Sequence, residues 1–292
     1  MNRAFALDWV DAFADRPFGG NGCAVVHDGG TLDDETCMAL VRETSLTECT
    51  FVGASEAADW KVRYFLAGKE IPFAGHPTLA TVASLAERGM VRGGRVVLET
   101  GAGAVPVEVG EDGRITMTQK APEFGEEVPG SIVADVVGLG PGDVVGMPQV
   151  VSTGLPFCIT VLRDHAALRR ARLDAQALTR FRAQFDRAPQ EVMEPFLVTL
   201  QGATARGRTF ARLLLDPPSP PEDPFTGSAT GAMAAYLWAR GLIDSPRFTA
   251  EQGHWTGRPG SAEVEVLGPR DAIAGVRVAG RAHVLIRGEL RL

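Results

Sequence analysis

Hydrophobic and polar residues alternate over many short stretches of this chain, which is the pattern of strands that bury one face. The clearest stretch is residues 60–68, where Trp60, Val62, Tyr64 and Leu66 share one side. This segment, with the strands that follow at 96–100, 104–110 and 114–119, predicts an antiparallel meander. The second half of the chain also consists mostly of short strand-like segments, with predicted strands at 156–162, 195–200, 208–215, 262–268, 275–280 and 282–290.

Two other segments have the spacing of surface helices. Residues 33–44 and residues 174–185 are amphipathic, and in the second Leu178, Phe181 and Phe185 form one stripe. A proline-rich segment, residues 216–224, follows later and is incompatible with a helix or a central strand. The pattern therefore predicts a mixed chain of many short strands and few helices.

An internal repeat divides the chain. Residues 73–91 match residues 225–243 without a gap at an offset of 152, and eight of 19 positions are identical. About two matches are expected by chance in a chain rich in Ala and Gly. The identical pairs are Phe73/Phe225, Gly75/Gly227, Thr78/Thr230, Ala80/Ala232, Ala83/Ala235, Leu85/Leu237, Arg88/Arg240 and Gly89/Gly241. Because the offset is close to half the length of 292 residues, the repeat predicts two equivalent lobes.

The repeated segments are predicted helices without a polar face. Neither 79–86 nor 231–239 contains a charged residue, and a helix that is apolar all round is enclosed on all sides. We therefore expect an α+β fold of two pseudo-symmetric lobes, each an antiparallel sheet or barrel rolled around a central helix. The predicted N-terminal lobe is 1–119 with helix 76–89, and the predicted C-terminal lobe is 120–292 with helix 227–241. The last strand, about 283–292, is expected to cross back to the N-terminal lobe.

The starts of the two central helices are the first candidate site. One begins with Gly75 and His76 and the other with Gly227 and Ser228. Free N–H groups and the positive end of the helix dipole make such starts favourable for anions. If a pseudo-twofold axis relates the lobes, both starts face one cleft between them, and such clefts are favoured ligand sites. The sequence thus predicts a small carboxylate held between two helix N-termini; the alternative is that both are ordinary capped helices.

Composition and charge exclude several classes of protein. Hydrophobic residues make up 45% and charged residues 22%, which are values of an ordinary globular chain. The net charge is 29 − 36 = −7, so we expect neither nucleic acid nor an anionic membrane as a partner. Four scattered Cys, an N-terminus with Asp8 and Asp11, and no long apolar run predict a cytoplasmic protein. No dinucleotide, P-loop or metal-ligand spacing is present, so we expect no cofactor and no metal.

Six segments resemble, in order, the signatures of the phenazine-biosynthesis isomerase family, the PhzF-like proteins. They are DAFADRPFGGNGCAVV (11–26), LTECTFV (46–52), PFAGHPTLAT (72–81), STGLP (152–156), EDPFTGSATG (222–231) and QGHWTGRPG (252–260). The chain departs from the family at Gly22, where Pro is usual, and at Ala74, where many members have Cys. The resemblance implies the fold of diaminopimelate epimerase and proline racemase, in agreement with the repeat. It also implies a homodimer and a cofactor-independent isomerase; the prototype moves a proton within trans-2,3-dihydro-3-hydroxyanthranilate.

The resemblance assigns roles to individual residues. Glu48 matches the family's proton shuttle, and desolvation would let one carboxyl act as base and then as acid near neutral pH. His76 would bind a substrate oxygen or relay the proton, and Asp223 would hold an amine or a hydroxyl. Ser228, with the N–H groups of Gly75 and Gly227, would hold the substrate carboxylate. Asn21 is a further candidate for substrate binding, and Gln119 a weaker one.

The sequence leaves three other functions open. A racemase or epimerase on the same fold resembles this chain, but those enzymes use two thiols at the positions of Ala74 and Thr226, which leaves only one-base transfer by Glu48. A hydrolase would use Ser228, His76 and Asp223, although the GxSxG motif is absent from the sequence. The third is a binding protein that retained the cleft without catalysis.

Overall fold

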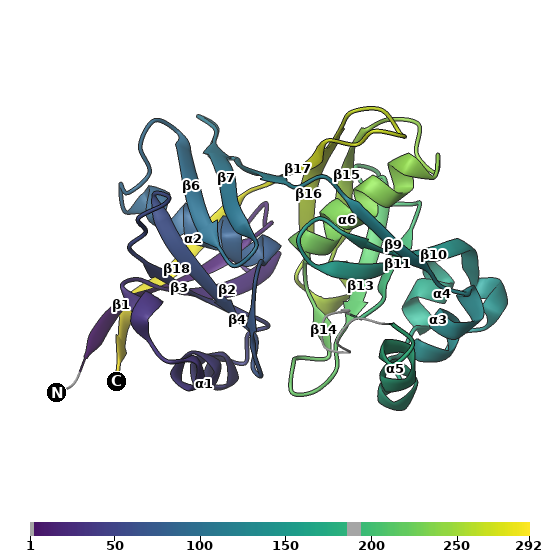
Figure 1. The fold of residues 1–292 in the computed structure, drawn as a ribbon, viewed down its shortest axis with the longest axis horizontal. Coiled ribbons are helices and arrows are strands. Elements are labelled where there is room, and N and C mark those ends of the chain that lie inside the picture. The colour runs from purple at the N-terminus through teal and green to yellow at the C-terminus, as the bar shows by residue number, and fades with distance from the viewer. Residues whose placement is uncertain (1–2, 186–193) are drawn as a thin grey trace.

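A computed structural model describes residues 3–185 and 194–292 as two lobes side by side (Figure 1). Each lobe wraps a curled sheet around one helix, α2 (Gly75–Glu87) in the N-terminal lobe and α6 (Gly227–Ala239) in the C-terminal lobe. The predicted fold class, α+β with two pseudo-symmetric lobes, is confirmed. Within the described ranges, no helix is both long enough and apolar enough to span a membrane.

The sheet of the N-terminal lobe combines antiparallel and parallel pairs. From β1, hydrogen bonds lead to β2, β3 and β4, and β4 then pairs with both β5 and β6, which continues to β7 and β8. The strands are β1 (Ala4–Ala12), β2 (Asn21–Val26), β3 (Cys49–Gly53), β4 (Trp60–Phe65), β5 (Glu70–Ile71), β6 (Arg95–Thr100), β7 (Gly103–Val109) and β8 (Ile115–Gln119).

The C-terminal lobe repeats this plan strand by strand. From β10, hydrogen bonds lead to β11, β12 and β13, which pairs with both β14 and β15, and the sheet continues to β16 and β17. The strands are β10 (Val144–Ser152), β11 (Pro156–Leu162), β12 (Phe196–Thr199), β13 (Thr209–Leu214), β14 (Glu222–Asp223), β15 (Arg247–Gln252), β16 (Gly260–Leu267) and β17 (Gly275–Gly280).

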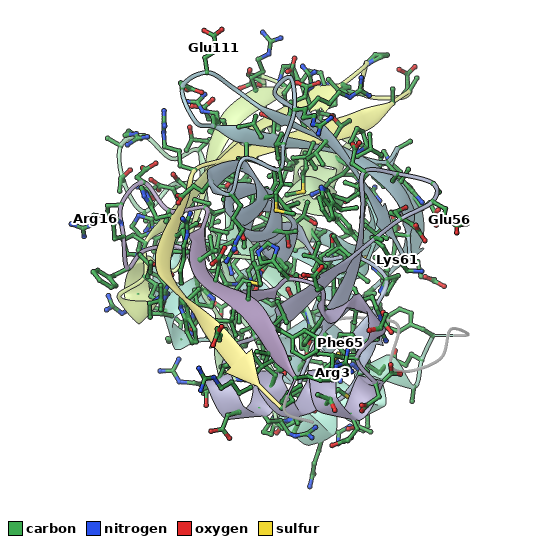
Figure 2. The ribbon with its side chains drawn as sticks, turned by 90° about the vertical axis from the view of Figure 1, so that its left-hand side faces the viewer. Arg3, Arg16, Glu56, Lys61, Phe65 and Glu111 are labelled. Carbon is green, nitrogen blue, oxygen red and sulfur yellow. The ribbon has the colours of Figure 1, made fainter. Side chains whose placement is uncertain are left out.

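The chain passes between the lobes twice, and after each crossing it forms a strand that pairs with the first strand of the lobe it enters. After β8 the chain crosses over, and β9 (Glu123–Glu127) pairs with β10; after β17 it crosses back, and β18 (Ala282–Arg291) runs antiparallel to β1. Figure 2 shows this strand, in yellow, beside the purple β1. The two crossings meet where β8 pairs with β17, so one sheet runs through both lobes. A boundary between residues 119 and 120 stays a prediction.

The predicted meander is right in part. Strands β6, β7 and β8 are successive antiparallel neighbours, as expected. Strand β4, however, is parallel to β6, and the expectation of an antiparallel pair there is wrong. The reason is α2, which lies between them in the chain: a helical crossover returns the chain in its original direction, which gives a parallel pair. The equivalent pair in the other lobe, β13 and β15, is parallel for the same reason.

Short helices cover the outer faces of both sheets. In the N-terminal lobe this is α1 (Asp34–Thr44), with Asp33 as N-cap, and η1 (Gly29–Thr31) lies nearby. In the C-terminal lobe a second hydrophobic core holds Leu168, Leu178 and Phe181. The outer elements there are α3 (Gly130–Val136), η2 (Pro141–Asp143), α4 (His165–Arg170) and α5 (Ala175–Arg182), followed later by η3 (His254–Thr256). The predicted helix 174–185 is thus three residues shorter at its end and has Asp174 as N-cap.

The central helices are enclosed as predicted. Every residue from Gly75 to Leu85 and from Gly227 to Leu237 is buried. Both helices end near Gly89 and Gly241, whose φ angles of 70° and 69° lie in the left-handed region that glycine tolerates at a helix end. The observed helices begin at or one residue before the predicted positions and end two residues earlier.

Candidate active site at the two helix starts

The two central helices begin against each other at the junction of the lobes. A Cβ atom on Gly75 would lie 2.3 Å from the backbone N of Ser228 and 2.5 Å from the backbone C of Gly227. Only a residue without a side chain permits this approach. Within the described residues, neither N-cap, Ala74 or Thr226, caps its helix with a side-chain hydrogen bond. Two positive helix ends therefore face each other, an arrangement that an anion between them would stabilise.

Glu48 and His76 lie together beside this junction. Glu48 precedes β3 directly, and its Oε2 lies 3.4 Å from Nδ1 of His76. Burial raises the pKa of Glu48 well above its usual value, and the nearby charge of Asp223 raises it further. Burial lowers the pKa of His76 to about 3, to which the positive charge of Arg258 contributes. At neutral pH the imidazole is therefore neutral, and burial favours the protonated form of the neighbouring carboxyl over the carboxylate.

Asn21 links the two lobes at the site. Its Nδ2 lies 3.0 Å from Nδ1 of His76, 2.5 Å from Oδ1 of Asp223 and 3.0 Å from the carbonyl oxygen of Phe225. An amide nitrogen has two hydrogens, so Nδ2 of Asn21 donates to two of these three atoms at a time. Nε2 of His76 is buried and has no hydrogen-bond partner among the described residues. This ring nitrogen is thus left for a ligand.

Asp223 is the second buried carboxyl of the site. Its Oδ2 accepts from Oγ1 of Thr226 at 2.6 Å, and its backbone carbonyl accepts from Nε2 of Gln252 at 2.7 Å. Gln252 also accepts from the backbone N–H of Thr226. Burial raises the pKa of Asp223 to about 6, against the lowering effect of its hydrogen bonds to Thr226, Asn21 and Thr47. The charge of Asp223 in turn raises the pKa of Glu48.

The predicted site residues come together in the structure. Glu48, His76 and Asn21 come from the N-terminal lobe, and Asp223 and the first turn of α6 come from the C-terminal lobe. The side-chain amide of Gln119 donates to the carbonyl of Gly227 at 2.9 Å and accepts from Thr153, so it supports the first turn of α6.

Sequence reasoning missed three supporting residues. Thr226 and Gln252 fix Asp223, and Oγ1 of Thr47 lies 3.5 Å from Oδ1 of Asn21. All three belong to the sequence signatures, so their positions were a usable signal.

The geometry also tests three other kinds of site: a Ser-His-Asp relay, a pair of thiols and a metal centre. Asp223 hydrogen-bonds to Asn21 and Thr226, and within the described residues it makes no hydrogen bond to His76, so a Ser-His-Asp relay is not assembled. All four Cys are free and buried, and none lies at a helix start. Over the described ranges, no group of three or more His, Cys, Asp or Glu side chains is arranged to hold a metal ion.

Comparison with known proteins agrees with this arrangement. Residues 10–288 match the PhzC-PhzF family, described as Phenazine biosynthesis-like protein. The chain belongs to this family. The uncharacterized isomerase YfhB of Bacillus subtilis is 31% identical over 91% of this chain and 92% of its own length. We therefore describe the chain as an enzyme of the PhzF-like isomerase and epimerase family.

Solved structures give the same family and fold. The Bacillus anthracis phenazine biosynthesis protein of the PhzF family has a TM-score of 0.82 and 26% identity over 99% of both chains. The predicted epimerase PA4716 from Pseudomonas aeruginosa has a TM-score of 0.81 and 32% identity over 98% of this chain and 99% of its own. A hydroxyproline epimerase from Agrobacterium vitis, with a TM-score of 0.67 and 14% identity over 99% of this chain and 92% of its own, shares the fold alone.

Proposed function

We propose that this protein is a cofactor-independent isomerase that moves a proton within a small cyclic or unsaturated carboxylate. The single observation that carries the proposal is the carboxyl of Glu48, buried beside two abutting helix N-termini and next to His76. Family membership supports the reaction class, and the prototype substrate, trans-2,3-dihydro-3-hydroxyanthranilate, is the first compound to test. A role in secondary-metabolite biosynthesis is part of the same proposal.

The substrate carboxylate is held where the helices begin. The N–H groups near Gly75 and Gly227, together with the hydroxyl of Ser228, would donate to it. As a proton leaves the ring, negative charge moves through the conjugated system onto this carboxylate. Donors that are already oriented stabilise that charge without reorganisation in the transition state.

Glu48 carries the proton in two steps. Its carboxylate takes a proton from an sp³ ring carbon, and the electron pair of the broken C–H bond enters the conjugated system. The resulting carboxylic acid returns the proton to another carbon, which shifts the double bonds with no change in oxidation state. An amine or hydroxyl of the substrate bound to Asp223 would weaken the effect of Asp223 on Glu48, lower the pKa of Glu48 and make it a base on binding. His76, whose Nε2 has no hydrogen-bond partner among the described residues, would hold a substrate oxygen or relay the proton, and Asn21 would position His76 and Asp223.

Proton transfer in heavy water tests the proposal directly. The protein is incubated with trans-2,3-dihydro-3-hydroxyanthranilate in D2O and followed by NMR, where a shifted double bond is the expected result. Glu48→Gln should lower the rate by at least about 100-fold, because a positioned acid–base group contributes roughly that factor. Glu43→Gln, an exposed carboxyl on α1, is the matched control and should be neutral. Equal rates in the two variants would refute the role of Glu48.

A one-base racemase or epimerase is the second candidate, favoured by the fold shared with the hydroxyproline epimerase. In the same NMR experiment, deuterium entering at one carbon with inversion and no double-bond shift would identify it. The positions of the thiols in such enzymes are Ala74 and Thr226 here, which weighs against a two-thiol mechanism. Detectable ligand binding that Glu48→Gln leaves unchanged, with no turnover of any compound, would indicate a binding protein instead.

Assembly and location complete the proposal. We take the protein to be a cytoplasmic homodimer, because the resemblance to PhzF-like proteins implies a dimer and the sequence predicts that location. Light scattering after size-exclusion chromatography should give twice the chain mass of 31.0 kDa. A mass of one chain at micromolar concentration would contradict the dimer.

A further inference from the structure

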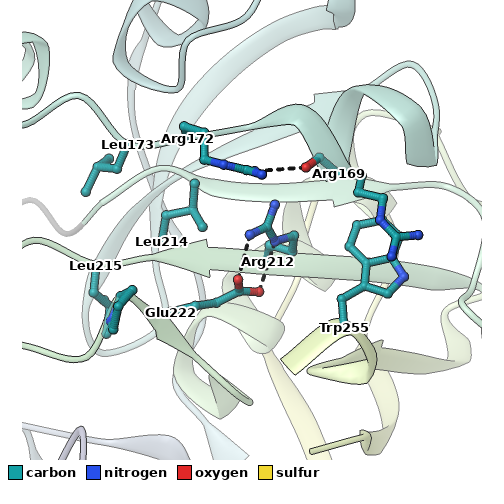
Figure 3. Close-up of a pocket in the computed structure, with 9 residues that line it drawn as sticks. Arg169, Arg172, Leu173, Arg212, Leu214, Leu215, Glu222 and Trp255 are labelled. Carbon is teal, nitrogen blue, oxygen red and sulfur yellow. Dashed lines mark hydrogen bonds and ion pairs between the residues drawn. The ribbon is translucent and has the colours of Figure 1, made fainter. Parts of the chain in front are cut away.

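A cavity on the outer face of the C-terminal lobe is separate from the candidate active site. It has a volume of about 490 Å³ and lies between the end of α4, the segment before α5, strands β13 and β14, and η3 (Figure 3). Leu213 and Asp223 form one cross-strand pair, and Leu214 and Glu222 form the next. Because successive residues of a strand face opposite sides, Leu214 and Glu222 line this cavity while Asp223 faces the active site.

The lining of the cavity carries excess positive charge. Its charged residues are Arg169, Arg172, Arg212 and Glu222, which sum to 3 − 1 = +2 in a chain of net charge −7. Arg212 is only 9% exposed and binds Glu222 with two hydrogen bonds, from Nε at 2.9 Å and from Nη2 at 2.6 Å. Glu222 is therefore already occupied by the buried arginine.

The other two guanidinium groups have no counter-charge among the described residues, since neither Arg169 nor Arg172 has a carboxylate within ion-pair distance there. Arg172 is held by backbone carbonyls instead, with Nη1 3.0 Å from the oxygen of Arg169 and 2.7 Å from that of Ala171. Figure 3 shows the guanidinium of Arg172 directed at the backbone oxygen of Arg169. Uncompensated guanidinium groups of this geometry are suited to a planar anion such as a carboxylate.

The rest of the lining is apolar. Trp255 forms one wall, where the guanidinium of Arg169 lies 5.0 Å from the ring centroid and that of Arg212 lies 6.0 Å from it. Leu173, Leu214, Leu215 and Pro221 complete the surface. The cavity thus offers a flat apolar wall beside a cationic end, and its volume falls in the range of about 300–1,000 Å³ that small-molecule sites occupy.

We propose that this cavity is a second binding site, for a small aromatic carboxylate. The carboxylate contacts Arg169 and Arg172, and the ring lies against the leucines, since the guanidinium of Arg169 already covers the ring of Trp255. The site is independent of the proton-transfer chemistry, since it requires neither Glu48 nor the helix starts.

Calorimetric titration of the full chain with 2-naphthoate tests this assignment. We expect saturable binding, with at least tenfold weaker binding of the neutral 2-naphthamide and of inorganic phosphate, because the first lacks the charge and the second lacks the ring. The double variant Arg169→Gln/Arg172→Gln should bind 2-naphthoate about tenfold more weakly, since two charge-assisted contacts are lost. Both side chains are exposed, so the fold should be retained.

Two controls distinguish binding in this cavity from binding elsewhere on the protein. Arg92→Gln/Arg180→Gln removes the same charge from exposed positions outside the cavity and should leave the affinity unchanged within twofold. Ser228→Ala alters the candidate active site and should also leave it unchanged. The proposal is overturned by the absence of saturable binding up to about 10 mM, by equal affinities of the two double variants, by phosphate binding as tightly as 2-naphthoate, or by loss of affinity in Ser228→Ala. None of these readouts depends on turnover.

Discussion

The two lobes have the same strand connections but place their buried carboxyls at different positions. In the N-terminal lobe Glu48 lies beside the start of α2, and in the C-terminal lobe Asp223 lies beside the start of α6. The offset of the repeat makes Ile71 the counterpart of Asp223, and both residues belong to the short strand before the central helix. One lobe thus has an apolar residue where the other has an acid.

The residue equivalent to Glu48 in the C-terminal lobe is also a glutamate, but its surroundings differ. Thr50 pairs with Tyr64, and Phe196 pairs with Leu213 at the equivalent point of the second lobe. Two residues before each lies a glutamate, Glu48 and Glu194. Glu194 binds Nη2 of Arg182 at 3.1 Å, whereas among the described residues Glu48 has no Arg or Lys within ion-pair distance. The duplicated fold thus places a glutamate at the equivalent point of each lobe, and among the described residues only Glu194 has an arginine partner, which leaves Glu48 available for the proposed proton transfer.

The largest expected effect tests the close approach of the helix starts. Gly75→Ala places a Cβ atom 2.3 Å from the backbone of Ser228, and Gly227→Ala places one 2.6 Å from the ring of Phe13. Since backbone yields less readily than a side chain tip, we expect losses of at least about 3 kcal/mol in the free energy of unfolding for Gly75→Ala and less for Gly227→Ala. Urea denaturation measures both. Gly68→Ala, where the Cβ atom would meet nothing within 4 Å, is the control. A stable Gly75→Ala protein would disprove the contact.

A second test compares the equivalent arginines after the two central helices. Arg88 donates two hydrogen bonds of 2.7 Å to the fully buried Asp8, whereas Arg240 donates to Gln149 at 2.8 Å and also pairs with Glu127. Asp8→Asn should lower the free energy of unfolding by about 2–3 kcal/mol, because it removes one partner of a largely buried ion pair.

The matched change in the other lobe should have little effect. Glu127→Gln removes the carboxylate of an exposed ion pair with Arg240, so we expect a change within about 1 kcal/mol in denaturant unfolding. Similar effects of the two substitutions would mean that the pairs are energetically alike, contrary to this comparison.

The third test uses pH to examine the carboxyl of the C-terminal lobe. The pKa of Asp223 is about 6 in the folded protein and near 3.8 when unfolded, so the folded state binds the proton more tightly. Proton binding to Asp223 therefore contributes to the free energy of unfolding at low pH. This contribution, on the order of 1–3 kcal/mol, is lost as the pH rises from about 4 to about 6. Asp223→Asn lacks this dependence. Because the charge of Asp223 also raises the pKa of Glu48, the comparison is made in a Glu48→Gln background. Between pH 7.5 and pH 4.5 the protein with Asp223 should gain stability relative to Asp223→Asn in urea unfolding, while proton uptake by His76 is common to both and cancels. A constant difference would contradict the raised pKa.

The smallest expected effect distinguishes the role of Ser228, at the start of α6, from that of His76, at the start of α2. Ser228→Ala removes one hydroxyl donor from the start of α6 and should raise KM by about fivefold with little change in kcat, the loss of one hydrogen bond of about 1 kcal/mol. His76→Gln, at the equivalent position of α2, should lower kcat instead, since His76 contacts Glu48, the proposed proton carrier. Steady-state kinetics on a compound that the enzyme turns over distinguishes the two. An unchanged KM in Ser228→Ala would remove the serine from the carboxylate site.

Much of the fold was predictable because the repeat and the all-apolar helices are local signals. Eight identities at one offset indicated the duplication, and the uncharged segments 79–86 and 231–239 indicated that each helix is enclosed. The parallel pairs, such as β4 with β6, were not predictable from alternation, because alternation does not encode the direction of the neighbouring strand.

Part of the site was predictable and part was not. Glu48, His76 and Asp223 were identified through their sequence signatures, and the structure brings them together. The amide of Asn21, by contrast, takes its importance from three acceptors that lie 55, 202 and 204 residues away along the chain. No local pattern carries that information.

The sequence by itself determined the duplication, the two enclosed helices, the glycine at each helix start and the presence of an acid in each half. Those features depend on residue type and short-range spacing, and both can be read directly from the amino-acid sequence. The tertiary structure alone decided that the helix starts abut, that His76 is neutral, that burial and the charge of Asp223 raise the pKa of Glu48, and that three arginines surround a cavity on the outer face. Desolvation and charge interactions depend on which distant groups are brought within a few ångströms, and only folding sets those distances.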